Sequence, residues 1–286
     1  MGGCVFGTHR ATRGPRRKSS GNILYVPVTL FIYFFALLTL CAQVEEKSFW
    51  CRFYEVPIAE YDAPDNLPME PFDLNDESVD IHTGKLEVDF THGPIGKGRF
   101  KTAHPGVVKL DGMRDLPPFT NSTVCVKQIY RERSNGAIAR VNGRDELGAF
   151  CTECNCIRWA SILLDLTYKF VEHEIKLRGK PKYPIPQLRY ARAMVAIVQG
   201  LPMEKAYLVE EWIETDEDER RYIKYINNRF PTSIVPFSAP QKAHDIASFL
   251  VFSQHLQWQK TKLGAFVSDY QGAGRLLTDP QITANP

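Results

Sequence analysis

The sequence predicts an α+β fold in which short strands surround one long helix and a second helix lies near the C-terminal end. Residues 85–90 alternate polar and apolar side chains, and residues 123–130 form a β-branched run, as strands do. Residues 150–178 repeat apolar side chains at helical spacing, and so does the segment after Pro240. We therefore expect strands and helices to share one fold.

The composition excludes some classes of protein. A chain of 286 residues can form one large domain or two small ones. Its 35 basic and 33 acidic residues nearly cancel, which gives no argument for a nucleic-acid partner. Seven cysteines at irregular spacing make a poor disulfide framework, so a reducing compartment is expected.

The N-terminal region divides into a basic segment, residues 1–22, and an uncharged hydrophobic segment, residues 23–43. Twenty apolar residues suffice for a transmembrane helix, while a signal peptide or an upstream reading frame wrongly joined to the coding sequence are the alternatives. The basic flank predicts a cytoplasmic N-terminus and would place the rest outside the cytosol. Asn121 would then lie in a glycosylation acceptor.

Residues 44–80 are rich in proline and acidic side chains and are predicted to be a linker, so that folding begins near Ile81. After the first strand, Gly96 and Gly98 are separated by one residue, in a Gly-x-Gly pattern. Such a pair forms an ordinary hairpin turn or lets backbone N–H groups approach a phosphate. Lys127 ends the next strand, a position where lysine is usually solvated.

The middle of the chain is predicted as a loop over residues 131–148 and a helix over residues 150–178. Three cysteines in six residues open that helix, but without a second cluster they do not complete a tetrahedral zinc site. Glu153 lies among them, in a helical turn where the dipole favours an acidic side chain. The three cysteines are Cys151, Cys154 and Cys156.

Two further strands are expected at residues 187–198 and 207–213, and the second contains Glu210 and Glu211. Acidic residues at a strand end are often merely solvated. His255 lies near the end of the second predicted helix, where a histidine is more often a plain surface or core residue than a ligand.

The last forty residues carry the most specific pattern, D-x-Q-G-x-G-x-x-x-T-D-P-Q-I. We interpret it as a loop whose polar side chains could converge on a metal-bound phosphate. These side chains are Asp269, Gln271 and Asp279.

This pattern, together with K-Y-x-x-N at residues 224–228 and E-x-N-C-x-x-W-A at residues 153–160, resembles the atypical alpha-kinase family of protein kinases. The resemblance covers about residue 85 to the end. It implies a two-lobed protein-kinase-like fold over residues 81–286, with a β-rich N-lobe at about 81–211, a long helix, and a partial C-lobe at 212–286.

The resemblance also implies roles for individual residues. Lys127 would reach the ATP phosphates and Glu153 would orient it. Asp269 would accept or orient the substrate hydroxyl, and Gln271 and Asp279 would hold Mg²⁺. The ATP-binding residues implied are Gly96, Gly98, Lys127, Glu153, Glu210, Glu211, Gln271 and Asp279. Of these, Glu210 or Glu211 would lie beside the adenine.

Zinc is expected for a complete domain of this family. His255 stands fourteen residues before Asp269, where the family places its first zinc ligand, although this chain has Phe-Ser-Gln-His instead of Phe-Ser-His. The other three ligands, expected as His-x-Cys-x-x-x-Cys, do not follow within these 286 residues. We therefore expect an incomplete zinc site and a weakened C-lobe.

The predicted function is that of an ATP-dependent serine/threonine protein kinase acting on protein substrates. The alternative is an inactive pseudokinase or nucleotide-binding module that lacks the zinc module. The kinase domain is expected to be cytoplasmic, or membrane-associated through residues 23–43. No sequence feature sets the oligomeric state.

Overall fold

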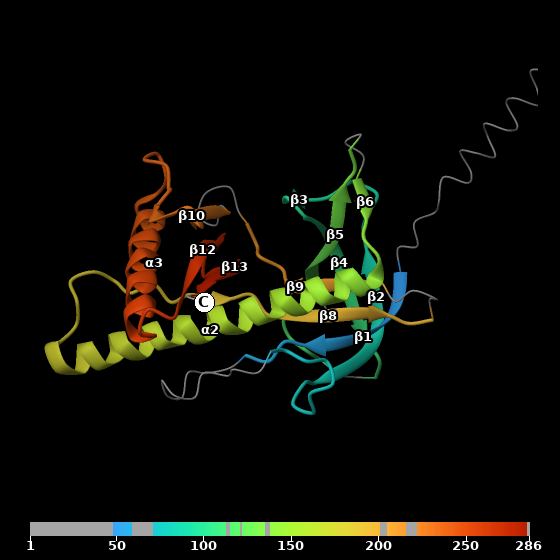
Figure 1. The fold of residues 1–286 in the computed structure, drawn as a ribbon, viewed down its shortest axis with the longest axis horizontal. Helices are drawn as coiled ribbons and strands as arrows, with labels where there is room; N and C mark the ends of the chain where they lie inside the picture. The colour runs from blue at the N-terminus through green and yellow to red at the C-terminus, as the bar shows by residue number, and fades with distance from the viewer. Residues whose placement is uncertain are drawn as a thin grey trace, which may run out of the picture. The chain divides into compact units, whose positions relative to one another are not determined.

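Two β-sheets and two helices make up the described part of the chain (Figure 1). The computed structural model describes residues 48–58, 71–112, 115–120, 122–134, 138–200, 205–215 and 222–284. All of them belong to one compact unit that spans Glu46–Pro286. The predicted segments 1–22 and 23–43 and the residue Asn121 lie outside the described residues.

The larger sheet has eight strands in the order β3-β4-β2-β1-β8-β9-β5-β6. An additional pairing of β4 with β5 closes six of these strands into a ring, which leaves no free edge between them. The strands are β1 Ser48–Glu55, β2 Ile81–Val88, β3 Gly96–Lys97, β4 Lys101–Leu110, β5 Thr123–Glu132, β6 Ile138–Arg140, β8 Ala193–Val198 and β9 Ala206–Glu211.

The smaller sheet has five strands in the order β11-β10-β12-β13-β7. Its only parallel pairing joins β13 to β7, and the other described pairings are antiparallel. The strands are β7 Arg189–Tyr190, β10 Ile223–Asn227, β11 Phe230–Ser233, β12 Ala265–Ala273 and β13 Leu276–Ala284.

Helix α2, Gly143–Arg178, runs past both sheets (Figure 1). The side chain of Asn142 caps its start by accepting a bond from the Asp145 N–H at 2.9 Å. Gly179, with φ 85°, ends it. Helix α3, Gln241–Lys260, follows Pro240 and packs on the smaller sheet.

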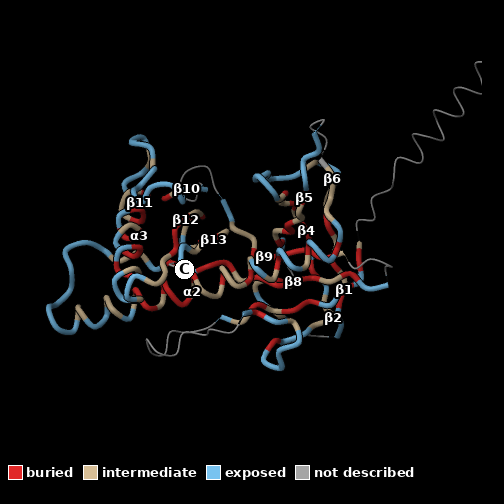
Figure 2. Tube along the Cα trace, in the orientation of Figure 1, coloured by how far each residue is buried: buried red, intermediate tan, exposed pale blue. Residues whose placement is uncertain are grey.

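Three apolar clusters hold these elements together, and Figure 2 shows the buried stretches of strand and helix that form them. One cluster fills the strand ring and includes Phe53, Leu86 and Val126. A second lies between that sheet and the first turns of α2. The third lies between both helices and the smaller sheet, around Leu163 and Leu250. Helix α2 thus contributes to two cores and links the sheets.

The α+β prediction is confirmed, but the structure differs from the sequence analysis in three elements. The predicted linker 44–80 is wrong at Ser48–Glu55, which forms β1 between β2 and β8. The long helix begins at Gly143, inside the predicted loop 131–148. The motif at 267–282 is a hairpin of β12 and β13 instead of a loop.

No helix of the described ranges combines the length and apolar character needed to cross a bilayer.

Candidate active site

Lys127 is the centre of a buried ion cluster. Alternation along β5 directs Val124 and Val126 into the ring core and Lys127 to the opposite face, where α2 packs. The Lys127 ammonium donates to Asp279 Oδ1 at 2.7 Å and to Glu210 Oε1 at 2.8 Å. Strands of both sheets therefore meet at one side chain that is only 6% exposed.

A second lysine, Lys101 of β4, enters the same cluster. Its ammonium donates to Asp279 Oδ1 at 2.8 Å and also bonds Glu153 Oε1. Glu153, carried by α2, lies 3.8 Å from the Lys127 ammonium. The predicted pairing of Glu153 with Lys127 is thus present as a longer contact, with Lys101 as the nearer partner.

The charges in this cluster shift one another strongly. Burial acts to lower the pKa of Lys127, but Asp279, Glu210 and Glu153 outweigh it and raise that pKa. Burial acts to raise the pKa of Asp279, yet the two lysines hold it far below its usual value. For Glu153 burial prevails and raises the pKa to about 7. The cluster therefore contains two cationic lysines, an ionised Asp279 and one carboxyl group that titrates near neutrality.

The oxygens of Glu153, Glu210 and Asp279 lie within 4.8 Å of one another, a donor set that suits a hard cation such as Mg²⁺. Asp279 also has a φ of 50°, in the left-handed region where Asp is tolerated and where functional residues are over-represented. It lies where the β12–β13 register shifts, since Gln271 pairs with Thr278 but Asp269 with Gln281. The irregular backbone thus presents Asp279 to both lysines.

Asp269 of β12 forms a separate and sparser arrangement. Its Oδ2 accepts a bond from the Lys224 ammonium of β10 at 2.9 Å. Its Oδ1 is buried and has no hydrogen-bond partner among the described residues. Burial raises the pKa of Asp269, and Lys224 opposes the shift. A buried, unsatisfied carboxylate oxygen is costly, and it favours a site that accepts a proton or a ligand.

Gln271 lies two residues further along β12, opposite Lys224 and Thr278 in the register, and is half-buried. Alternation along a strand places side chains two residues apart on one face, although the bulge between Asp269 and Gln271 loosens this rule. Asn228, from the K-Y-x-x-N pattern, donates to Gln281 Oε1 at 2.7 Å and so ties β10 to β13.

Gly96 lies in β3, opposite Ala103 of β4, and Gly98 lies in the turn of the β3–β4 hairpin. The Gly98 N–H donates to the Lys101 carbonyl at 2.8 Å, and both glycines have room above the backbone. The hairpin reading is confirmed. The approach of a phosphate stays a prediction.

Glu210 and Glu211 point to opposite sides of β9. Glu210 Oε2 accepts from Thr278 at 2.7 Å in addition to its bond with Lys127. Both oxygens of Glu211 accept bonds of 2.6 Å from the Arg189 guanidinium. Both carboxylates are thus already engaged, and their predicted place beside an adenine stays a prediction.

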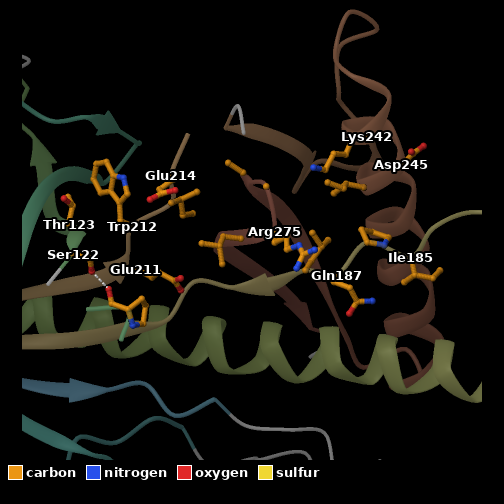
Figure 3. Close-up of a pocket in the computed structure, with 18 of the residues that line it drawn as sticks. Ser122, Thr123, Ile185, Gln187, Glu211, Trp212, Glu214, Lys242, Asp245 and Arg275 are labelled. Atoms are coloured by element: carbon orange, nitrogen blue, oxygen red, sulfur yellow. Dashed lines mark hydrogen bonds between the residues drawn. The ribbon is translucent and has the colours of Figure 1, made fainter. Parts of the chain in front are cut away.

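Glu211 also lines a cavity of about 1170 Å³ that excludes the ion cluster. Figure 3 shows Glu211, Trp212 and Glu214 on one side of this cavity and Lys242 and Asp245 of α3 on the other. Because neither lysine of the cluster lines it, we place the candidate active site at the cluster and not in this cavity.

The zinc prediction gains no support. His255 is exposed, and its Nε2 lies 3.0 Å from Gln259 Nε2. Among the described residues, the group of three His, Cys, Asp or Glu side chains close enough to share a metal consists of Glu153, Glu210 and Asp279, without His255. The described residues around His255 therefore do not fit a zinc ion. The α2 cysteines, Cys151, Cys154 and Cys156, form no disulfide among the described residues.

The sequence analysis missed Lys101 and Thr278 as members of the cluster. Lys101 pairs with Ile129, two residues after Lys127, so antiparallel pairing carries both lysines to one face. Its position three residues after Gly98, next to the predicted phosphate hairpin, was the available signal. Thr278 directly precedes Asp279 within the quoted motif.

Comparison with known proteins finds one matching family model and several similar structures. The model of the alpha-kinase family matches residues 96–285. An alpha-kinase from Entamoeba histolytica matches with a TM-score of 0.50 and 15% identity over 84% of this chain and 78% of that one. The alpha-kinase domain of myosin-II heavy chain kinase A, in complex with AMP-PNP, matches with a TM-score of 0.48 and 16% identity over 85% and 84%. No curated protein gives a significant match.

Proposed function

The chain belongs to the alpha-kinase family, and from this premise we propose that it is an ATP-dependent serine/threonine protein kinase. It transfers the γ-phosphoryl group of ATP to a Ser or Thr hydroxyl of a protein substrate. The observation that carries the proposal is the convergence of two lysines and Asp279 beside a buried carboxylate, Asp269, with one free oxygen.

Phosphoryl transfer depends on positioning and on neutralising phosphate charge more than on covalent work by the protein. Lys127 and Lys101 supply two positive charges on one face of the β4–β5 pair. Both are held by carboxylates before ATP arrives, so their ammonium groups need little reorganisation to meet phosphate oxygens. Glu153 keeps the lysines together from the side of α2.

Mg²⁺ fits the site because carboxylate and amide oxygens are ligands that this ion accepts. Asp279 and Gln271 would hold it, and the bound ion would neutralise charge on the β- and γ-phosphates. Lys127 and Lys101 lower the pKa of Asp279, so its carboxylate is ionised, as a metal ligand must be.

Asp269 accepts the proton of the attacking hydroxyl at its free Oδ1. The hydroxyl oxygen bonds to the γ-phosphorus, the bond from that phosphorus to the bridging β–γ oxygen breaks, and ADP leaves with the bridging oxygen. Lys224 holds Oδ2 and thereby orients the carboxylate. A pKa raised by burial makes Asp269 a better proton acceptor than a solvated aspartate.

The test is transfer of the γ-phosphate of labelled ATP, with Mg²⁺, to a generic basic protein, followed by phosphoamino-acid analysis. We expect phosphoserine and phosphothreonine without phosphotyrosine. Asp269→Ala should lower transfer by about 10²- to 10⁴-fold while ATP still binds. Lys127→Met should abolish nucleotide binding, and Asp111→Ala, an exposed residue far from the motif in sequence, is the matched control for an aspartate loss.

Retained turnover in Asp269→Ala would contradict the role of that residue. If the wild-type chain binds ATP but transfers nothing, the function would be that of a nucleotide-binding module instead. Unchanged ATP affinity in Lys127→Met would contradict the site itself.

A further inference from the structure

Tyr130 holds the tip of the glycine hairpin by three contacts. Its hydroxyl donates to the Gly98 carbonyl, and its backbone N–H donates to the Phe100 carbonyl at 2.9 Å. The Lys97 ammonium lies 5.4 Å from the centre of its ring. Tyr130 is itself only 4% exposed, so it is a fixed support for the turn.

This support comes from the face of the sheet opposite the ion cluster. Lys127 and Ile129 share one face of β5, and Lys101, which pairs with Ile129, shares it too. Tyr130 is the next residue after Ile129 and therefore points to the other face. The hydroxyl of Tyr130 thus draws the Gly98 carbonyl away from the lysines.

Planarity of the peptide bond fixes the direction of the N–H group that follows the Gly98 carbonyl. In a trans peptide, the carbonyl and the following N–H point in opposite directions. The Gly98–Arg99 bond is trans, since the cis bond among the described residues joins Pro117 to Pro118. With the Gly98 carbonyl turned toward Tyr130, the Arg99 N–H is turned toward the face of Lys101 and Lys127. Arg99 lies in the turn between β3 and β4 and is an exposed residue.

We propose that Tyr130 is a positioning residue for the nucleotide phosphates: through the Gly98 carbonyl, it aims the Arg99 backbone N–H at the phosphate held by Lys101 and Lys127. Backbone N–H groups in tight turns are good donors to phosphate oxygens. This role rests on the proposed function, because it requires that ATP binds at the cluster.

The test compares binding of ATP, with Mg²⁺, and of adenosine by titration calorimetry. Removing one hydroxyl in Tyr130→Phe should weaken ATP binding about three- to tenfold, the usual range for one hydrogen bond, and leave adenosine binding unchanged. In turnover, KM for ATP should rise by the same factor while kcat stays within about twofold, since binding is lost equally in ground and transition states.

Tyr168→Phe is the matched control. Its hydroxyl also donates to a backbone carbonyl, that of Pro186 at 2.7 Å, but Tyr168 is a half-buried residue of α2 that packs against the core of the smaller sheet. We expect unchanged ATP affinity in this variant. A general loss of packing would instead weaken ATP and adenosine binding alike in Tyr130→Phe, which would overturn the proposal, as would unchanged ATP affinity.

A second measurement uses the wild-type protein, so its result does not depend on whether a variant folds. Hydrogen exchange of the Arg99 amide should slow when ATP is added, and an unchanged rate would overturn the role of Tyr130 while leaving the proposed function intact. Absence of ATP binding by the wild-type chain would overturn both.

Discussion

One lysine–carboxylate arrangement joins the two sheets around Lys127 and another lies within the smaller sheet around Lys224, and they differ in how completely their charges are satisfied. Lys127 is 6% exposed and has bonds to Glu210 and Asp279. Lys224 is 43% exposed and, among the described residues, pairs with Asp269. The first arrangement is a closed cluster, whereas the second leaves the Oδ1 atom of Asp269 unsatisfied.

The two arrangements suit two different tasks, binding of phosphate charge and acceptance of a proton, and one lysine–carboxylate pair could not perform both. A buried ammonium must be compensated on all sides, so the Lys127 cluster is rigid and can meet phosphate charge without rearrangement. A proton acceptor must instead keep a free lone pair, which Asp269 does at a cost in stability. We infer that the first arrangement serves binding and the second serves chemistry.

The largest effect on stability is expected when the closed cluster loses the charge of Lys127 at its centre. Lys127→Met leaves Glu153, Glu210 and Asp279 with Lys101 as their only cation among the described residues of the cluster. Breaking a buried ion pair in this way typically costs about 3–5 kcal/mol of unfolding free energy. Urea unfolding followed by circular dichroism measures it.

Lys109→Met is the matched control, because Lys109 also sits on a strand and pairs with Glu87 but is largely exposed. Its unfolding midpoint should equal that of the wild type. Adding Glu210→Gln to Lys127→Met should recover part of the lost stability, since it removes one uncompensated charge. Equal unfolding midpoints for Lys127→Met and Lys109→Met would contradict the comparison.

Whether a residue of the candidate site could be predicted from the sequence depends on how far apart in the chain its interacting partners lie. Asp269 and Asp279 could be found from the sequence because both lie in one motif with fixed spacing, and Lys127 was assigned only through the family resemblance. Lys101 was missed although it follows Gly98 by three residues, since only the β4–β5 register places it beside Lys127. Register is set by the packing of both faces and is not encoded within four or five residues.

Strand β1 shows the same limit in the fold. Phe49, Cys51 and Phe53 are buried in alternation, so a period of two was present in the sequence. Its partners on β8 are far away, with Cys51 opposite Val198, and the proline-rich stretch that follows suggested a linker. The start of α2 is a different case, because Asn142 followed by Asp145 is a local capping signal that two nearby glycines obscured.

A smaller effect on stability is expected when the open arrangement loses its cation. Lys224 is substantially exposed, so Lys224→Ala should change the unfolding free energy by no more than about 1 kcal/mol. Phosphate transfer should nevertheless fall, because Oδ2 of Asp269 loses the bond that orients it. Unfolding in urea and kcat on the same preparations give both values. A loss of stability as large as that of Lys127→Met, with kcat unchanged, would reverse the proposed division of tasks.

The smallest effect is expected at His255, the residue that the family resemblance assigned to zinc. A closed structural zinc site contributes much of the folding free energy of a small domain, so loss of a true ligand would be severe. His255 instead lies exposed on α3, next to Gln259, outside the carboxylate cluster. We therefore expect His255→Ala to change the unfolding free energy by less than about 0.5 kcal/mol, as for an ordinary surface residue. Thermal unfolding with added zinc and with a chelator should give one Tm for the wild type and the same for the variant. A Tm that rises with zinc in the wild type alone would show that His255 binds the metal.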